Sequence, residues 1–266
     1  QGKMRVPAPR AQLSIATSVW KALLLREAST RLMTGRAGWL WLLLEPATHI
    51  VFLMMMFAVV RKRQIAGANV ELFVLTGVLG FFLVRNVARR GAEAINANTA
   101  LFAYRQVKPI DAVLVRGVLE ASVMAVIGVL LLVACAVVGI PILPHDPLRI
   151  GVASWLLWGL GMGLALTLSV AGTLVPEIGK VATLAFTPLY FVSAVMFPID
   201  TVPPSLRRYL LANPIVHGLE AIRGGFFANY HSDDQISLMY LFFSTVVIVF
   251  AGLVLHARYA RRLIAQ

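Results

Sequence analysis

The sequence predicts an all-α, polytopic membrane protein with six transmembrane helices. Hydrophobic residues occupy 59% of the 266 positions and charged residues only 14%, whereas soluble domains carry about 25% charged residues. Six apolar segments reach or approach the ~20 residues that a helix needs to cross a bilayer. The 24 Lys and Arg residues outnumber the 12 Asp and Glu residues and lie mostly between these segments, and there is a single cysteine. This composition excludes a soluble enzyme, a nucleic-acid-binding protein and a disulfide scaffold.

Each expected span is a mainly apolar run bounded by polar or charged residues. The second and fifth runs are short and need their flanking residues to reach both membrane interfaces. An even number of spans places both termini on the same side of the membrane. The six expected spans are residues 39–60, 72–87, 113–138, 152–174, 181–197 and 236–256.

The distribution of basic residues predicts that both termini are cytoplasmic. In that orientation most Lys and Arg residues lie on the cytoplasmic side, as the positive-inside rule requires. Arg61, Lys62 and Arg63 go against the rule, because they follow the first span and would flank the outer exit. Two interpretations are open: a basic exit rim that binds lipid headgroups or guides an acidic polymer, or a cluster that is tolerated because the N-terminal bases fix the orientation.

Two segments are expected to be helical without crossing the membrane. Residues 11–34 are too charged to span, but their broken apolar stripe suits a helix in the cytoplasmic interface. The connection between the second and third spans is long and polar. A helix over about residues 90–104 is expected to end before Pro109, because a proline disfavours helix at the preceding Lys108.

The connection between the fifth and sixth spans is the longest, at residues 198–235. It contains two apolar stretches, 206–211 and 215–227, which are separated by Asn213 and Pro214. Neither stretch is long enough to cross a bilayer. Two short helices that enter and leave the outer leaflet fit this pattern, provided that protein shields their ends.

The sequence carries no recognisable catalytic or nucleotide-binding motif. Gly179 and Lys180 come nearest to a phosphate-binding loop, but Leu174 and Val181 stand where that motif requires Gly and Ser or Thr. The five histidines lack the spacing of a metal site. We therefore expect no cofactor bound directly by this chain, and we expect another chain to supply the energy for any work it performs.

The first span has a candidate functional face. Trp41, Glu45 and His49 recur every four residues and so share one side of a helix, which Pro46 is expected to bend. An aromatic ring beside polar groups suits a conduit for sugars. The alternative is that Glu45 is buried against a base of a neighbouring span, for instance Arg85.

The second span has a candidate face near its cytoplasmic end. Phe81, Arg85 and Arg89 lie four residues apart, and the two guanidinium groups suit the phosphate or carboxylates of an anionic glycolipid. The alternative is that both arginines simply extend to the interface, as bases at span ends do. On the third span, Arg116 and Glu120 are spaced i,i+4 and are expected to neutralise each other.

The fifth span carries an aromatic stripe. Phe186, Tyr190, Ser193 and Phe197 are predicted to share one face of a helix that Pro188 bends. Rings with an interleaved hydroxyl suit a sliding sugar chain, which needs many weak contacts. Ordinary helix packing would give the same pattern.

The polar connection between the second and third spans contains an apolar and aromatic knob. Leu101, Phe102 and Tyr104 are followed by Arg105 and further bases. A short helix with such a knob can insert into the cleft of a partner protein. The alternative is a solvated loop whose aromatic residues lie among lipid headgroups.

Three segments resemble the permeases of ABC type-2 exporters, and most closely the capsular-polysaccharide, KpsM-type, inner-membrane subunit. They are the N-terminal amphipathic helix, NANTALFAYRQVKPID at residues 96–111, and FPIDTVPPSLRRYLLANPIVHGLEAIRGGFF at residues 197–227. The resemblance covers essentially the whole chain. It implies one transmembrane domain over residues 1–266.

The resemblance also implies an architecture and partners. Such permeases form a homodimer that binds two separate ATP-binding cassette ATPase chains, and these chains hold ATP and Mg²⁺. Their channel is lined largely by the first and fifth spans, which favours the two stripes described above. The implied segments are an interface helix at 1–36, a coupling-helix loop at 88–112 with its helix at about 91–107, and outer gate helices within 198–235, at about 203–212 and 214–228.

The function implied by the resemblance is export of lipid-linked, acidic capsular polysaccharide across a bacterial inner membrane. Membrane lipids and a periplasmic co-polymerase-like partner are further expected contacts. The same fold exporting O-antigen, teichoic acid or a small amphiphile is an alternative. A polytopic membrane transferase is an alternative of another class, although catalytic acids or histidines do not converge at one interface in the sequence.

Overall fold

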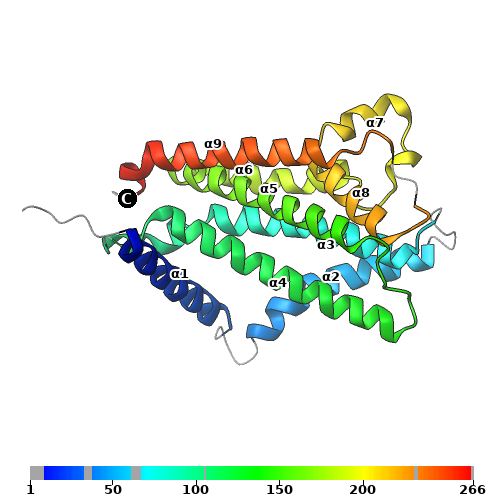
Figure 1. Cartoon of the computed structure of the whole chain (residues 1–266), viewed down its shortest axis with the longest axis horizontal. Coiled ribbons are helices and arrows are strands. Elements are labelled where there is room, and N and C mark those ends of the chain that lie inside the picture. Colours follow the sequence, from blue (N-terminus) through cyan, green and yellow to red (C-terminus); the bar gives the residue numbers. More distant parts are fainter. Residues whose placement is uncertain (1–8, 33–37, 61–66, 105, 231–232, 265–266) are drawn as a thin grey trace, which may run out of the picture.

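The computed structural model describes residues 9–32, 38–60, 67–104, 106–230 and 233–264, and these are organised as α-helices and short 3₁₀ helices (Figure 1). The all-α class predicted from the sequence is confirmed. The elements are α1 (Pro9–Leu32), α2 (Gly38–Val60), α3 (Val70–Ala92), η1 (Asn96–Ala103), α4 (Pro109–Val137), α5 (Pro147–Leu174), α6 (Pro176–Val192), η2 (Ile199–Thr201), α7 (Pro204–Leu211), α8 (Pro214–Phe226) and α9 (Leu238–Ile264).

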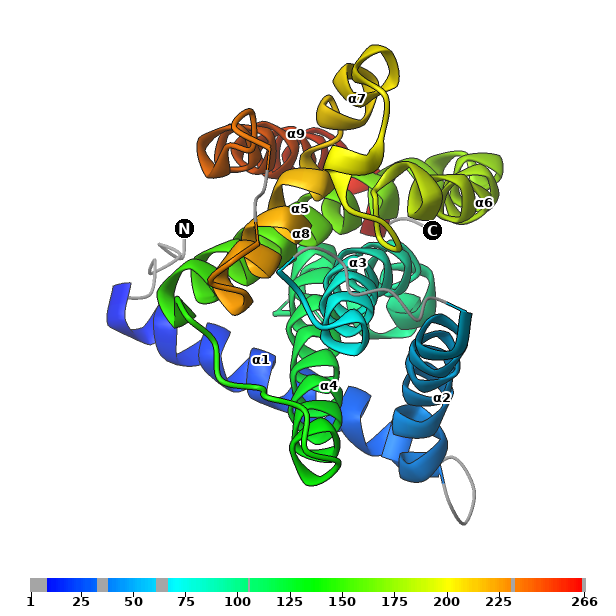
Figure 2. The same ribbon diagram turned by 90° about the vertical axis from the view of Figure 1, so that its right-hand side faces the viewer.

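The long helices run side by side along one axis, and the two ends of the bundle differ (Figure 1). One end holds α1, η1 and the C-terminal end of α9, and the other holds α7 and α8. Figure 2 looks along the bundle from the α7–α8 end and shows α3 near its centre. Helix α3 packs against α2, α4, α5, α6 and α8, and most of its residues are buried. The apolar core is therefore built around this helix.

Among the described residues, four helices are long and apolar enough to cross a membrane: α3, α4, α5 and α9. Helix α2 contributes a shorter apolar stretch, Pro46–Phe57, and α6 has 17 residues. The six-span count therefore stays a prediction for these two helices. Both contain the proline that was expected to bend them, Pro46 in α2 and Pro188 in α6.

Helix starts follow local sequence signals. Asn69, Asp146 and Asn213 precede α3, α5 and α8, and each side-chain oxygen accepts a hydrogen bond from a backbone N–H of the first turn, at 3.1, 2.9 and 3.0 Å. Such capping satisfies one of the N–H groups that a helix start leaves without a partner. The predicted division of the 198–235 connection at Asn213 is thus confirmed, with α7 and α8 on its two sides.

The predicted single helix over 90–104 is divided in the structure. Helix α3 continues to Ala92, and the 3₁₀ helix η1 contains Asn98 with non-helical dihedral angles (φ −126°, ψ 15°). The Asn98 side chain donates to the Ala94 carbonyl at 2.8 Å and accepts from Arg26 of α1 at 2.9 Å. An Asn side chain that bonds nearby backbone competes with regular helix, and here a residue distant in sequence holds it in place.

The fifth predicted span also ends earlier than expected. Helix α6 stops at Val192, Ser193 donates to the Leu189 carbonyl at 2.6 Å, and Ala194 adopts a φ of 53°. A left-handed residue ends a helix because it turns the chain away from the helical path. Phe197 therefore lies beyond the helix, and its predicted place on the α6 stripe is wrong.

Helix α1 is held against the η1 end of α4 by two polar contacts. Arg116 of α4 forms an ion pair with Glu27 of α1, with Nε and Oε1 2.8 Å apart, and Trp20 donates to Asp111 at 2.9 Å. Glu120 lies 3.8 Å from Arg90 of α3. The expected pairing of Arg116 with Glu120 is wrong, because each residue finds an oppositely charged partner on another helix.

Candidate functional site

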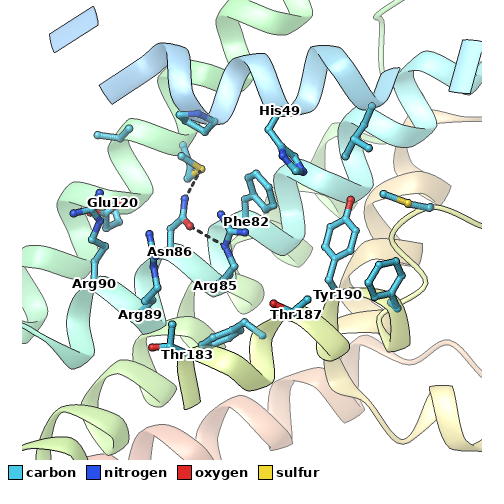
Figure 3. A pocket seen from close by; sticks show the side chains of 17 residues that line it. His49, Phe82, Arg85, Asn86, Arg89, Arg90, Glu120, Thr183, Thr187 and Tyr190 are labelled. Carbon is cyan, nitrogen blue, oxygen red and sulfur yellow. Dashed lines mark hydrogen bonds and ion pairs between the residues drawn. The ribbon is translucent and has the colours of Figure 1, made fainter. Parts of the chain in front are cut away.

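A cavity of about 620 Å³ lies between α2, α3, α4 and α6 (Figure 3). Its volume falls within the about 300–1,000 Å³ that is usual for small-molecule sites. The residues around it are a mixture of bases, aromatic rings, hydroxyls and apolar side chains. They are Pro46, His49, Leu53, Phe82, Arg85, Asn86, Arg89, Arg90, Glu120, Val123, Met124, Thr183, Phe186, Thr187, Tyr190, Phe191 and Met196.

The basic part of the cavity comes from the last two turns of α3. The Arg85 guanidinium lies 3.9 Å from the centre of the Phe82 ring, and its Nε donates to Asn86 at 3.2 Å. Arg90 faces Glu120 as described above. The buried Nε of Arg89 has no hydrogen-bond partner among the described residues. Because buried donors are normally satisfied, Arg89 is the base best placed to take an anionic group from a ligand.

The aromatic part lies farther from the η1 end, between α2 and α6 (Figure 3). The His49 ring lies 5.3 Å from the Phe82 ring, and the Tyr190 ring meets Phe81 edge-on at 5.1 Å. The Tyr190 hydroxyl is buried without a hydrogen-bond partner in the described part of the chain. Thr187, one turn earlier on α6, adds an exposed hydroxyl. Rings next to hydroxyls that can still bond match the faces and edges of a sugar.

The structure brings together half of the conduit residues predicted from the sequence. His49, Arg85, Arg89, Phe186 and Tyr190 line the cavity. Among the described side chains, Trp41, Phe81, Ser193 and Phe197 do not line it.

Four of the others lie behind or outside the cavity walls. Phe81 is buried behind Tyr190, and Ser193 is buried at the end of α6, where its hydroxyl accepts from Asn213 at 2.9 Å. Trp41 is 68% exposed on α2. Phe197 packs near the buried residues Ala194, Ile199 and Val216. The Glu45 side chain lies outside the described residues, so the choice between its two interpretations stays open.

Several cavity residues were not singled out from the sequence. Phe82, Asn86 and Arg90 share the α3 face with Arg85 and Arg89, and Thr183 and Thr187 share the α6 face with Tyr190. The i, i+3, i+4 and i+7 spacing of each face would have found them. Glu120 is different, because it comes from α4 and pairs with Arg90 across a gap of 30 positions in the sequence. No helical pattern predicts that contact.

The predicted knob is only partly exposed. Phe102 is buried against Val113 and Leu166 in a cluster between η1, α4 and α5, and Leu101 is half-buried. Tyr104 is 67% exposed at the end of η1. Arg105 and the exit-rim residues Arg61, Lys62 and Arg63 lie outside the described residues. The partner-docking role of this segment stays a prediction, for which Tyr104 is the available side chain.

Comparison with known proteins gives a family. Residues 18–227 match the family described as "ABC-2 type transporter". The chain belongs to this family. Over 236 residues it is 36% identical to the polysialic acid transport protein KpsM of Escherichia coli, covering 89% of this chain and 91% of the relative. Two further ABC-2 relatives are the capsule polysaccharide export inner-membrane proteins CtrC of Neisseria meningitidis (31% identical, 94% of each chain) and BexB of Haemophilus influenzae (27% identical, 95% of each chain).

Proposed function

We propose that this chain is the permease subunit of an ATP-driven exporter that moves lipid-linked, acidic capsular polysaccharide across a bacterial inner membrane. The observation that carries the proposal is its similarity, over about nine-tenths of both chains, to a polysialic acid transport protein. Capsule export proteins from two other bacteria share the similarity. The bundle of long apolar helices supports the same role.

The cavity supports an acidic cargo. Arginine binds phosphate and carboxylate groups through two parallel hydrogen bonds, and Arg89, whose buried Nε has no hydrogen-bond partner among the described residues, lines the cavity. The arginines lie toward the η1 end and the rings of His49 and Tyr190 toward the other end (Figure 3). A glycolipid that enters at the arginines would therefore meet a series of aromatic surfaces. Neutral O-antigen or a small amphiphile would use the rings without needing the bases, and teichoic acid would use the bases through its phosphates.

Energy is supplied in this proposal by two copies of a separate ATP-binding cassette ATPase, which hold ATP and Mg²⁺. The permease acts as a homodimer with both termini in the cytoplasm, and a periplasmic co-polymerase-like partner receives the polymer. Tyr104 on η1 supplies the exposed ring for the ATPase contact. Membership in the ABC-2 family supports the ATPase partner.

Movement of η1 has a direct path to the cavity. Helix α3, which carries all three cavity arginines, ends four residues before η1 begins. Asn96 of η1 accepts a hydrogen bond from Thr173 of α5 at 3.1 Å, and Asn98 is held by Arg26 of α1. A push on η1 would thus move α3 together with α1 and α5, and would change the spacing between α3 and α6. In this mechanism that change releases the anionic group and advances the chain.

The test of the cargo is a binding measurement on the full chain in lipid nanodiscs, with lipid-linked polysialic acid as the acidic probe and a neutral lipid-linked O-antigen as the comparison. Arg89→Gln removes one charge-assisted contact worth about 1.5–3 kcal/mol, so affinity for the acidic probe should fall roughly tenfold to a hundredfold. Arg89→Lys keeps the charge and should lose less. Equal binding of both probes by the native chain would reject the acidic cargo. If Arg89→Gln bound the acidic probe as tightly as the native chain, the alternative that Arg89 only extends to the membrane interface would hold instead.

A further inference from the structure

A second cavity, of about 410 Å³, opens on a different face of α3, between α3, α4, α5 and α8. Its lining is almost entirely apolar, and the hydroxyl of Thr76 already donates to the carbonyl of Leu72 in its own helix at 2.8 Å. Apart from Thr76 and Ser154, the lining side chains are aliphatic, aromatic or sulfur-containing. They include Leu75, Leu79, Leu83, Ile150, Trp155 and Trp158.

This cavity lies between helices that are suited to cross a membrane. Its walls α3, α4 and α5 are three of the helices that are long and apolar enough to span a membrane. Trp155 is 68% exposed at its edge, and its ring centre lies 4.7 Å from that of Trp158, with the two rings tilted by 52°. An apolar cavity that stays empty forfeits the dispersion contacts of its lining atoms. A flexible hydrocarbon chain from the bilayer is the ligand that such a wall accommodates.

A basic side chain, Arg149, lies next to the cavity without lining it. Arg149 lies in the first turn of α5, directly before the lining residue Ile150, and its guanidinium lies over Gly224 of α8. The guanidinium makes no hydrogen bond or ion pair with any part of the chain that the structure describes. The nearby Asp146 carboxylate caps α5 by accepting from the Arg149 backbone N–H at 2.9 Å. Within the described residues, the half-buried Arg149 guanidinium therefore has N–H donors to offer a ligand.

From these two features we infer a lipid-binding site: one acyl chain of a membrane glycerophospholipid occupies the cavity, and its phosphate binds Arg149. From Arg149 to Trp158 the helix rises about 13 Å at 1.5 Å per residue, which is close to half of the ~30 Å hydrocarbon core. The acyl chain of the lipid thus lies within the membrane leaflet at the α7–α8 end. Basic positions at the surface end of a groove between transmembrane helices suit phospholipid headgroups.

The lipid site adjoins the cavity between α2, α3, α4 and α6, which is called the cargo cavity below because of the proposed function. The two cavities share one residue. Met124 of α4 lines both cavities, and its sulfur accepts a hydrogen bond from Asn86 of the cargo cavity at 3.6 Å. Met is flexible and fills irregular gaps. A bound acyl chain fixes the Met124 side chain from one side, and so supports the wall of the cargo cavity.

The test is native mass spectrometry of the full chain, purified in detergent and titrated with palmitoyl-oleoyl phosphatidylglycerol. One phospholipid per chain should survive mild activation. Gly151 lines the cavity, and a Cβ built on it meets no atom within 4 Å, so Gly151→Leu should add apolar volume there and remove the retained lipid. Arg149→Gln should weaken binding about fivefold, the value for one base near a membrane surface, and Arg149→Lys should restore most of it.

Val129→Leu is the matched control, since Val129 is exposed on α4 and does not line the cavity; it should bind lipid as the native chain does. Retention of the phospholipid by Gly151→Leu would overturn the inference. So would a retained mass that corresponds to a glycolipid cargo or to another protein. The measurement does not depend on transport, so its result is separate from that of the proposed export function.

Discussion

Arg223 and its partner Glu220 are both charged and have no exposed surface. One of the terminal nitrogens of Arg223 donates to the Ala194 carbonyl at 2.9 Å and to Glu220 at 2.8 Å, and the other donates to the Val195 carbonyl. The guanidinium also lies 3.6 Å from the centre of the Phe73 ring of α3. Arg223 therefore fixes the chain directly after α6 to both α8 and α3.

The partner carboxylate is itself fully bonded. Tyr230 donates to the second oxygen of Glu220 at 2.8 Å. Burial, followed by the negative charge of Glu220, raises the pKa of Tyr230, so its hydroxyl stays protonated and able to donate at neutral pH. Both oxygens of Glu220 are therefore bonded, whereas the buried Nε of Arg223 has no hydrogen-bond partner among the described residues. Removing one partner of such a buried pair is costly, because the other charge is then left without compensation.

Replacing Arg223 should therefore destabilise the protein strongly. Arg223→Met leaves Glu220 buried without its cation, which costs about 3–5 kcal/mol. The midpoint of thermal unfolding in detergent, followed by tryptophan fluorescence, measures the effect. Arg208→Met, at an exposed arginine of α7, is the matched control and should change stability by less than about 0.5 kcal/mol. Equal midpoints for the two variants would contradict this role for Arg223.

Helical spacing in the sequence predicted part of the lining of the cavity between α2, α3, α4 and α6. The four-residue spacing on α3 and α6 correctly grouped Arg85 with Arg89 and Phe186 with Tyr190, because helical periodicity decides which side chains share a face. It could not supply Glu120, since the pairing of α3 with α4 depends on tertiary packing. It also placed Trp41 inside, although the rotation of α2 about its axis turns this ring outward.

At the scale of elements, the sequence predicted where helices start, but it did not predict where α6 ends or where the helical turn of η1 becomes irregular. Prolines and capping residues mark the starts of α4, α5 and α8 in the sequence itself. The end of α6 instead depends on the carbonyls that Arg223 binds, and the irregular turn in η1 depends on the contact of Asn98 with Arg26. These contacts join residues that are far apart in the chain, so local patterns carry no signal for them.

The η1 element should transmit the ATPase signal through Tyr104. Tyr104→Ala removes the exposed ring while leaving Phe102 and its buried cluster intact. We expect the tagged chain, expressed in its own host, to co-purify less ATPase and to export less polysaccharide, with an unchanged unfolding midpoint. Tyr209→Ala, at an exposed tyrosine of α7, is the control. A native chain that retains no ATPase would reject the partner assignment as a whole, and full coupling in Tyr104→Ala would reject only this contact.

At the scale of the whole molecule, the two ends of the bundle hold different structural elements and charged groups. The η1 end gathers α1, η1, the arginines of α3 and the basic C-terminal turn of α9. The α7–α8 end gathers the short helices and the Arg223 network. Basic residues near span ends favour the cytoplasmic side, so the η1 end is expected to face the cytoplasm, where an ATPase can reach it.

Cysteine labelling tests this orientation with little disturbance, because Cys135 is the single cysteine of the chain and is buried. In a Cys135→Ser background, Glu177→Cys places a thiol in the exposed first turn of α6 at the η1 end, and Tyr209→Cys places one on exposed α7. A membrane-impermeant maleimide added to spheroplasts should label Tyr209→Cys at once and Glu177→Cys only after the membrane is permeabilised. The reverse order would invert the topology, and with it the direction in which the basic end of the cavity receives its cargo.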